Sequence, residues 1–202
     1  MPTNKGWELR LIDQQYQFDE VTSSLQKMIR RGKEYEACYW AYVLHQSNYG
    51  EYLWRRLSII CSEDVGNGSP EASMLLDSLR NSWERLHKRI KEPTLDKFLF
   101  ITQIVLYLCR SPKTRENDSL SNLINEHWQQ GVRLPVPTIG KDSHTNSGRK
   151  KWGKFGAKDG KEKLRLDKWF SYWALITNKA YPDKWKGELK NLWLEKAGEN
   201  VK

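Results

Sequence analysis

The 202-residue sequence has no long hydrophobic run. No stretch of 18 apolar residues occurs, which excludes a membrane-spanning helix, and MPTNKGWELR at the start lacks the apolar segment of a secretory signal. Cysteine is also scarce, because Cys38, Cys61 and Cys109 are the only three and each lies in an apolar helical pattern. They indicate buried thiols in a reducing compartment, so we expect a cytoplasmic protein.

Motifs for catalysis or cofactor binding are incomplete. GRKKWGKF (148–155) matches GxxxxGK but has Phe155 where a phosphate-binding loop needs Ser or Thr. Pro182-Asp183 and Glu188-Leu189-Lys190 resemble a PD…ExK nuclease motif, but only four residues separate them. The four histidines lack companion ligands at metal-binding spacing, and DVGNGSPE lacks the ligand order of a calcium loop. We therefore predict no cofactor, no metal and no enzymatic activity.

The positive charge is confined to the last third of the chain. Residues 1–130 carry 17 Lys and Arg against 17 Asp and Glu, whereas residues 131–202 carry 17 against 8, which accounts for the whole net charge of +9. Such a localised positive field favours a polyanionic partner, above all nucleic acid. A solvated tail explains the same charge equally well.

Apolar spacing predicts an all-α fold for residues 1–130. Asp19 is the expected N-cap of the first helix, Gly32 its end, and Ser69 the expected N-cap of the fourth helix, with Pro70 in its first turn. The expected helices span about 19–31, 34–46, 51–65, 70–90, 95–111 and 115–130, where Gly131 ends the last.

Residues 131–163 contain several prolines and glycines and little apolar periodicity, so we expect a linker and a basic loop there. Asp167 and Asp183 are expected to cap two Trp-rich amphipathic helices. The sequence thus predicts a helical domain over 1–130 and a basic extension over 131–202.

The segment SEDVGN places Glu63 and Asp64 at the end of a predicted helix, just before Gly66. The helix dipole disfavours anions there by up to ~1 kcal/mol, so these carboxylates need a partner or a function. We expect them to pair with Arg55 and Arg56, through a neighbouring residue or with another subunit.

Three segments carry a resemblance to a known family. VTSSLQKMIRRGKEYEACYW, YLWRRLSIICSEDVGNGSPEA and ITQIVLYLCRSPKT resemble the carboxy-terminal region of the replication-associated recombination protein A family. These proteins (RarA, MgsA and the Werner helicase-interacting protein) are AAA+ ATPases related to clamp loaders. The resemblance covers about residues 18–125 and fades beyond Gly131, where HTNSGRKKWGK is only weakly similar to a tail motif of some members. No Walker motif is present, so the sequence resembles the carboxy-terminal piece alone.

The resemblance implies an all-α helical bundle like the clamp-loader collar, which holds family members as tetramers. Full-length members act on single-stranded DNA ends and gaps, but this activity needs the ATPase module. The implied oligomerisation motif comprises Arg55, Arg56, Glu63, Asp64, Gly66, Asn67, Pro70, Pro112 and Lys113.

Two functional hypotheses follow. The first is a non-catalytic, oligomeric DNA-binding accessory in replication, recombination or repair, which would contact single-stranded or forked DNA through cations and aromatic rings. Its candidate DNA-binding residues are Arg149, Lys150, Lys151, Trp152, Lys154, Phe155, Lys158, Lys161, Lys163, Arg165 and Lys168. The alternative is a protein-interaction module that co-assembles with a full-length RarA-type ATPase. An enzyme would require polar side chains converging in a pocket, for instance around Asp142, His144 and Arg149.

Overall fold

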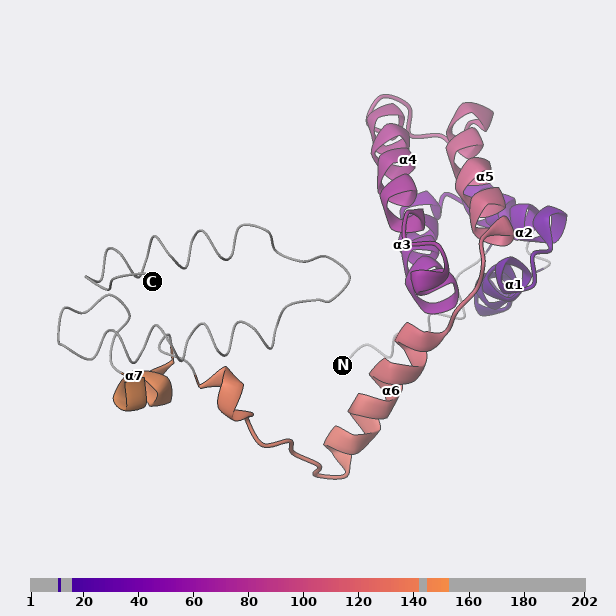
Figure 1. The fold of residues 1–202 in the computed structure, drawn as a ribbon. Coiled ribbons are helices and arrows are strands. Elements are labelled where there is room, and N and C mark those ends of the chain that lie inside the picture. Colours follow the sequence, from indigo (N-terminus) through magenta and orange to yellow (C-terminus); the bar gives the residue numbers. More distant parts are fainter. Residues whose placement is uncertain (1–10, 12–15, 142–144, 153–202) are drawn as a thin grey trace, which may run out of the picture. The chain divides into compact units, whose positions relative to one another are not determined.

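The structure is a computed structural model that describes residues 11, 16–141 and 145–152. These residues form helices and no strands, which confirms the all-α prediction (Figure 1). The elements are α1 (Phe18–Arg30), α2 (Glu34–Gln46), α3 (Gly50–Ile60), η2 (Cys61–Val65), η3 (Gly66–Gly68), α4 (Ala72–His87), α5 (Leu95–Arg110), α6 (Glu116–Gln129), η4 (Thr138–Gly140) and α7 (Asn146–Trp152). None of the helices in this part of the chain is long and apolar enough to cross a membrane.

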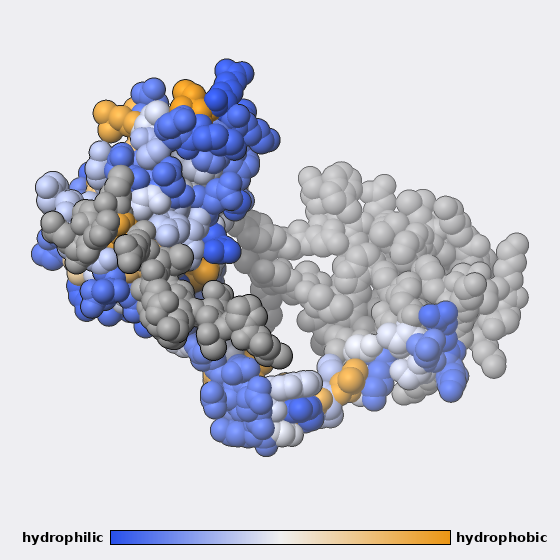
Figure 2. Space-filling view, turned by 180° about the vertical axis from the view of Figure 1, so that it is seen from behind, coloured by the Kyte–Doolittle hydropathy of each residue, from blue (hydrophilic) through white to orange (hydrophobic). Residues whose placement is uncertain are grey.

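The chain divides into two compact units, Met1–Val132 and Arg133–Lys202. In the first unit α1 packs on α2, and α5 packs on both α2 and α4, around one hydrophobic core (Figure 1). Most of the fully buried large residues of this core come from α1, α2, α3 and α5, namely Leu25, Ile29, Leu44, Leu53, Trp54, Leu57, Ile60, Ile101, Ile104 and Leu108. Hydrophilic residues cover most of the described surface seen in Figure 2, where hydrophobic residues form separate patches.

The sixth helix differs from the other five of the first unit. None of the residues of α6 is buried, and it packs mainly on η2 and η3. Figure 1 shows α6 extending from the bundle, with only its first turn close to the other helices. An amphipathic helix that buries no residue gains little from packing, so its stability rests on its anchored N-terminal end.

Two predicted helix starts are wrong by a few residues, for tertiary reasons. The first helix begins at Phe18 with Gln17 as N-cap, because the ring of Phe18 is buried against Tyr49 and Tyr52. Asp19 therefore lies inside the first turn. The fourth helix begins at Ala72 rather than directly after Ser69. The hydroxyl of Ser69 lies 3.0 Å from that of Tyr107 and does not cap the helix.

The described part of the second unit also corrects the prediction of a loop. Residues 146–152 form α7, because Thr145 accepts a hydrogen bond at its side-chain oxygen from the N–H of Gly148 (3.0 Å). The carbonyl of Thr145 accepts another from the N–H of Arg149 (2.8 Å). The two helices expected after Asp167 and Asp183 lie outside the described residues.

Candidate functional site

The two carboxylates of the SEDVGN segment lie in a π-helical turn rather than in an α-helix. α3 ends at Ile60, and Cys61–Val65 continue it as the π-helical turn η2, in which backbone hydrogen bonds join residues five positions apart rather than four. Such turns are rare and occur frequently at functional sites. η2 then leads through η3 to α4, and it places the side chain of Asp64 at 0% exposure.

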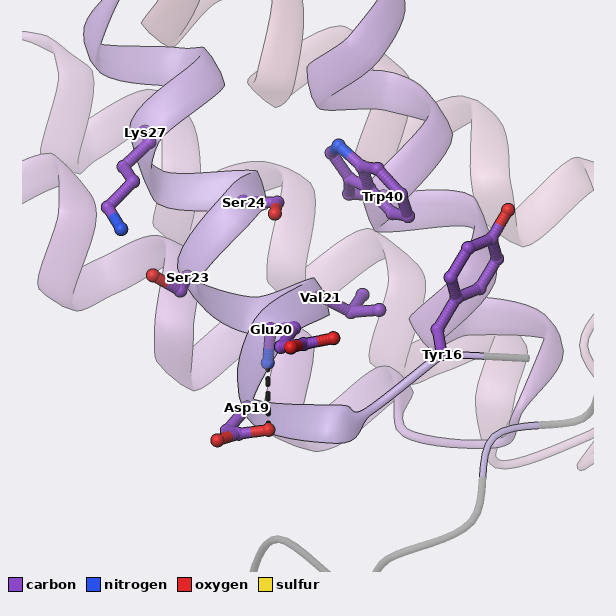
Figure 3. Close-up of a pocket in the computed structure, with 8 residues that line it drawn as sticks. All are labelled: Tyr16, Asp19, Glu20, Val21, Ser23, Ser24, Lys27 and Trp40. Atoms are coloured by element: carbon purple, nitrogen blue, oxygen red, sulfur yellow. Dashed lines mark hydrogen bonds between the residues drawn. The ribbon is translucent and has the colours of Figure 1, made fainter. Parts of the chain in front are cut away.

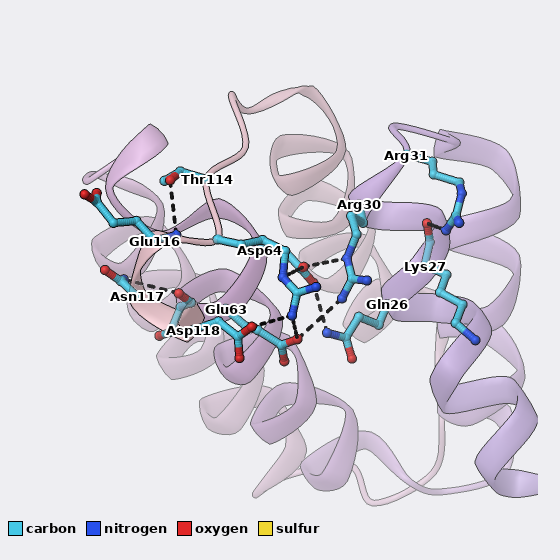
Figure 4. Close-up of polar contacts among 12 residues, drawn as sticks. Gln26, Lys27, Arg30, Arg31, Glu63, Asp64, Thr114, Glu116, Asn117 and Asp118 are labelled. Atoms are coloured by element: carbon cyan, nitrogen blue, oxygen red, sulfur yellow. Dashed lines mark hydrogen bonds and ion pairs between the residues drawn. The ribbon is translucent and has the colours of Figure 1, made fainter. Parts of the chain in front are cut away.

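Asp64 accepts hydrogen bonds from two residues of α1. Its Oδ1 lies 2.6 Å from Nε of Arg30, and its Oδ2 lies 3.0 Å from Nε2 of Gln26 (Figure 4). Nε of Arg115 lies 3.8 Å from the same Oδ1. The hydrogen bond to Asp64 raises the pKa of Arg30, against the opposing effect of partial burial. The buried charge is thus paired and hydrogen-bonded, as its burial requires.

Glu63 extends the same cluster toward α6. Its Oε1 accepts hydrogen bonds from Nη2 of Arg115 (3.1 Å) and Nη2 of Arg30 (3.4 Å). Nη2 of Arg115 also donates to the carboxylate of Asp118 in the first turn of α6. One cluster of charges therefore joins α1, η2 and the start of α6 (Figure 4).

Backbone contacts hold the same junction. The N–H of Thr114 donates to the carbonyl of Asp64 (3.1 Å), and Nδ2 of Asn117 donates to the carbonyl of Ser62 (3.3 Å). Gly66 has φ +49°, and a Cβ there would lie 3.1 Å from Nδ2 of Asn117. A Cβ on Gly68 would lie 2.7 Å from the carbonyl oxygen of Pro112. Both glycines therefore permit the close approach of residues 112–117.

Lys113 fixes the segment that leads into this junction. Its ammonium group donates to the carbonyls of Leu108 (2.7 Å), Cys109 (3.0 Å) and Ser111 (2.6 Å). These carbonyls belong to the end of α5, where a cation is favourable. Partial burial lowers the pKa of Lys113. The segment between α5 and α6 is thus held at a defined position against η3.

The expected pairing with Arg55 and Arg56 is partly wrong. Arg56 reaches the site only through Gln26, whose Oε1 accepts from its Nη2 while Nε2 of the same amide donates to Asp64. Arg55 instead lies 5.3 Å from the centre of the Tyr52 ring. The direct partners, Arg30 and Arg115, belong to the same chain. Asn67 contacts Asn117 at 3.4 Å, and Pro70 lies in the turn before α4.

Sequence reasoning missed Gln26, Arg30 and Arg115. Arg30 lies within the segment VTSSLQKMIRRGKEYEACYW, and Arg115 directly follows ITQIVLYLCRSPKT. A buried carboxylate indicates that a cation is near, but the pattern gives no means of choosing among several arginines. The selection is made by the fold, which places Arg30 of α1 and Arg115 beside η2.

The charged groups of the cluster are paired with one another and join α1, η2 and the start of α6. The atoms of Glu63 and Asp64 that face the cluster are occupied by protein partners, and no group of three metal-ligating residues occurs in the part of the chain that the structure describes. The candidate DNA-binding residues Arg149, Lys150, Lys151 and Trp152 lie on α7. Lys154, Phe155, Lys158, Lys161, Lys163, Arg165 and Lys168 lie outside the described residues.

The fold and the site define an all-α domain whose helices are joined by an ionic cluster around one buried carboxylate. A family model described as "MgsA AAA+ ATPase C terminal" matches residues 33–160, so the chain belongs to this family. The match continues past Gly131, which corrects the expectation that the resemblance fades there, and it begins after α1. The family comprises the carboxy-terminal part of these ATPases.

One relative is the Haemophilus influenzae protein named Replication-associated recombination protein A. It is 29% identical over 143 residues, which cover 69% of this chain and 30% of the relative. The chain therefore spans less than a third of the length of this curated relative.

Proposed function

We propose that this chain is a non-catalytic helical module that self-associates and contacts DNA during replication-associated recombination. Membership of the MgsA carboxy-terminal family and the name of the Haemophilus influenzae relative support a role in replication-associated recombination. The family resemblance supports assembly as a tetramer. One structural observation carries the proposal of self-association, namely the exposed apolar stripe of α6.

This α6 stripe consists of Leu120, Leu123 and Ile124, which are 55%, 52% and 59% exposed. Positions 120, 123 and 124 lie on one face of a helix. Water contact with three large aliphatic side chains is unfavourable by about 25 cal/mol per Å² of apolar surface, so a covering partner would stabilise this helix. A second copy of the chain, approaching with its own α6, presents a matching apolar surface.

The charge distribution supports the contact with DNA. The whole net charge of +9 lies in residues 131–202, and within this region α7 exposes the side chains of Arg149 and Lys150. Cations of this kind neutralise phosphates, while aromatic rings between them stack on unpaired bases. Several copies in one assembly would strengthen weak individual contacts.

The mass of the intact chain in solution tests self-association. Light scattering should give a multiple of the monomer mass for the wild type and a smaller mass for Leu123→Glu, which places a charge in the α6 stripe. Asn125→Glu is the matched control, because it adds the same charge to an exposed position on the opposite side of α6. A wild-type monomer at all concentrations, or equal masses for both variants, would contradict the proposal.

The same α6 stripe supports a second candidate, co-assembly with a full-length MgsA-type ATPase. In that case the intact chain would co-purify with such an ATPase after nuclease treatment, and Leu123→Glu would abolish the co-purification. Binding to single-stranded DNA by the chain alone would then be absent, which separates this candidate from the first.

A further inference from the structure

A cleft of about 450 Å³ lies along α1, on the side that faces α2. Tyr16, just before α1, and Trp40, on α2, contribute two aromatic rings to its wall (Figure 3). Glu20 and Ser24 contribute a carboxylate and a hydroxyl from α1. The α6 stripe and the cluster around Asp64 do not line this cleft.

The two rings stand nearly perpendicular to each other. The centres of the Tyr16 and Trp40 rings are 5.2 Å apart at an angle of 86°. The hydroxyl of Tyr16 lies 3.0 Å from that of Tyr39, whose own ring packs edge-on against Trp40 at 5.1 Å. These contacts hold both rings in place without covering them completely, since Tyr16 and Trp40 are only half-buried. Aromatic faces attract cations through their quadrupoles.

A carboxylate lies beside these rings. Figure 3 shows the Glu20 side chain directed toward Tyr16, beneath Trp40. The carboxylate of Glu20 has no hydrogen bond or ion pair with other described residues, and the residue is exposed. Asp19, in the same cleft, uses one oxygen to accept the N–H of Glu20 (2.9 Å). Two acidic residues therefore give this end of the cleft a negative potential.

Among the residues that the structure describes, Lys27 is the cation that lines the cleft, and it is directed elsewhere. Lys27 points away from Trp40 in Figure 3, on the side of α1 that carries Ser23. It therefore does not neutralise Glu20. A group that enters between Tyr16, Trp40 and Glu20 meets two aromatic rings and a carboxylate that has no partner among the described residues, which disfavours anions and favours cations.

We propose that this cleft, the α1 cation cleft, binds a lysine or arginine side chain presented by a partner protein. The aliphatic stem of such a side chain packs against the rings, while its charged end meets Glu20. The hydroxyl of Ser24 accepts a further hydrogen bond from the cation. The proposal assigns the α1–α2 face of the bundle to protein recognition, and it does not depend on self-association or on DNA binding.

The test uses the intact ¹⁵N-labelled chain and the capped tripeptide acetyl-Gly-Arg-Gly-amide, with the lysine tripeptide as a second probe. We expect a saturable shift of the Trp40 indole N–H resonance with both peptides. The tripeptide with citrulline, which is neutral and nearly isosteric with arginine, should bind at least ~5-fold more weakly, because the ionic and cation–π contributions are lost.

Variants locate the site. Glu20→Gln should weaken binding of the arginine tripeptide about 3- to 5-fold, and Tyr16→Leu roughly 5- to 30-fold. Glu36→Gln is the matched control, since it removes an exposed carboxylate from α2 that does not line the cleft. Equal binding of the citrulline peptide, no saturable shift at Trp40, or an unchanged affinity for Glu20→Gln would each overturn the proposal.

Discussion

Oδ1 of Asp64 lies 2.6 Å from Nε of Arg30, although the two residues are 34 positions apart in the sequence. The contact joins α1 to the turn between α3 and α4, and the Asp64 side chain is completely buried. Through Arg115, the same cluster reaches the start of α6. The orientation of the helix that carries the exposed α6 stripe thus depends on charges in the bundle.

Replacement of Asp64 by alanine should destabilise the first unit. Removing one member of a buried ion pair leaves its partner uncompensated, which costs about 3–5 kcal/mol. Because Arg30 and Arg115 keep 31% and 46% of their side-chain surface exposed, solvent relieves part of this cost. We expect a loss of about 3 kcal/mol in the free energy of unfolding, measured by urea denaturation.

A double-mutant cycle separates this pair from general disruption. Asp64→Ala combined with Arg30→Ala should cost clearly less than the sum of the single variants. Glu34→Ala is the control, because its ion pair with Arg110 is exposed and should leave the denaturation midpoint nearly unchanged. Additive costs at Asp64 and Arg30 would show that the contact contributes nothing.

Gly66→Ala should destabilise the chain more than Gly131→Ala does. Both glycines have positive φ, +49° and +80°, so an alanine is strained at each by about 1–3 kcal/mol. At Gly66 the new Cβ would also press on Asn117 and on the carbonyl of Thr114, whereas at Gly131 nothing lies within 4 Å. Thermal unfolding of the two variants measures the difference, and equal melting temperatures would rule out crowding at Gly66.

The sequence was sufficient to predict the helices and the need of Asp64 for a partner. A period of 3.6 in apolar residues marks α1, α3 and α4 because each buries one face of its own sequence. The start of α1 was predicted wrongly because it depends on Tyr49 and Tyr52, which lie more than 30 residues away. Local patterns contain no information about such contacts.

The local features of the candidate site were predictable from the sequence, but the partners of its carboxylates were not. Gly66 and Asp64 are local features, since a glycine commonly ends a helix and an acid at the end of a helix is unfavourable. The choice of Arg30 and Arg115 over Arg55 follows from the fold, which brings Arg30 of α1 and Arg115, just before α6, next to η2. The α1 cation cleft, likewise, exists only because Tyr16 and Trp40 meet across two helices.

Acidification should destabilise the fold through His45. Burial lowers the pKa of this histidine from 6.5, and its Nε2 donates to the carbonyl of Thr94 (2.9 Å) in the neutral form. Because the unfolded chain binds the proton more readily, stability is complete above pH 6.5 and falls as the pH drops below it. His45→Gln keeps a donor and should flatten this dependence between pH 7 and 5, apart from a share from His87, whose pKa burial also lowers. An unchanged slope in urea titrations would contradict the assignment.

Binding to single-stranded DNA should depend steeply on salt and on α7. If about five phosphates are neutralised, log affinity should fall with log salt at a slope near −3.5. Lys150→Gln removes one exposed cation of α7 and should reduce this slope by about 0.7 for oligo(dT). Lys88→Gln, at the exposed end of α4 in the first unit, is the matched control and should leave the slope unchanged. Equal slopes for the two variants would remove α7 from the DNA contact, and affinity that persists at high salt would exclude an electrostatic interface altogether.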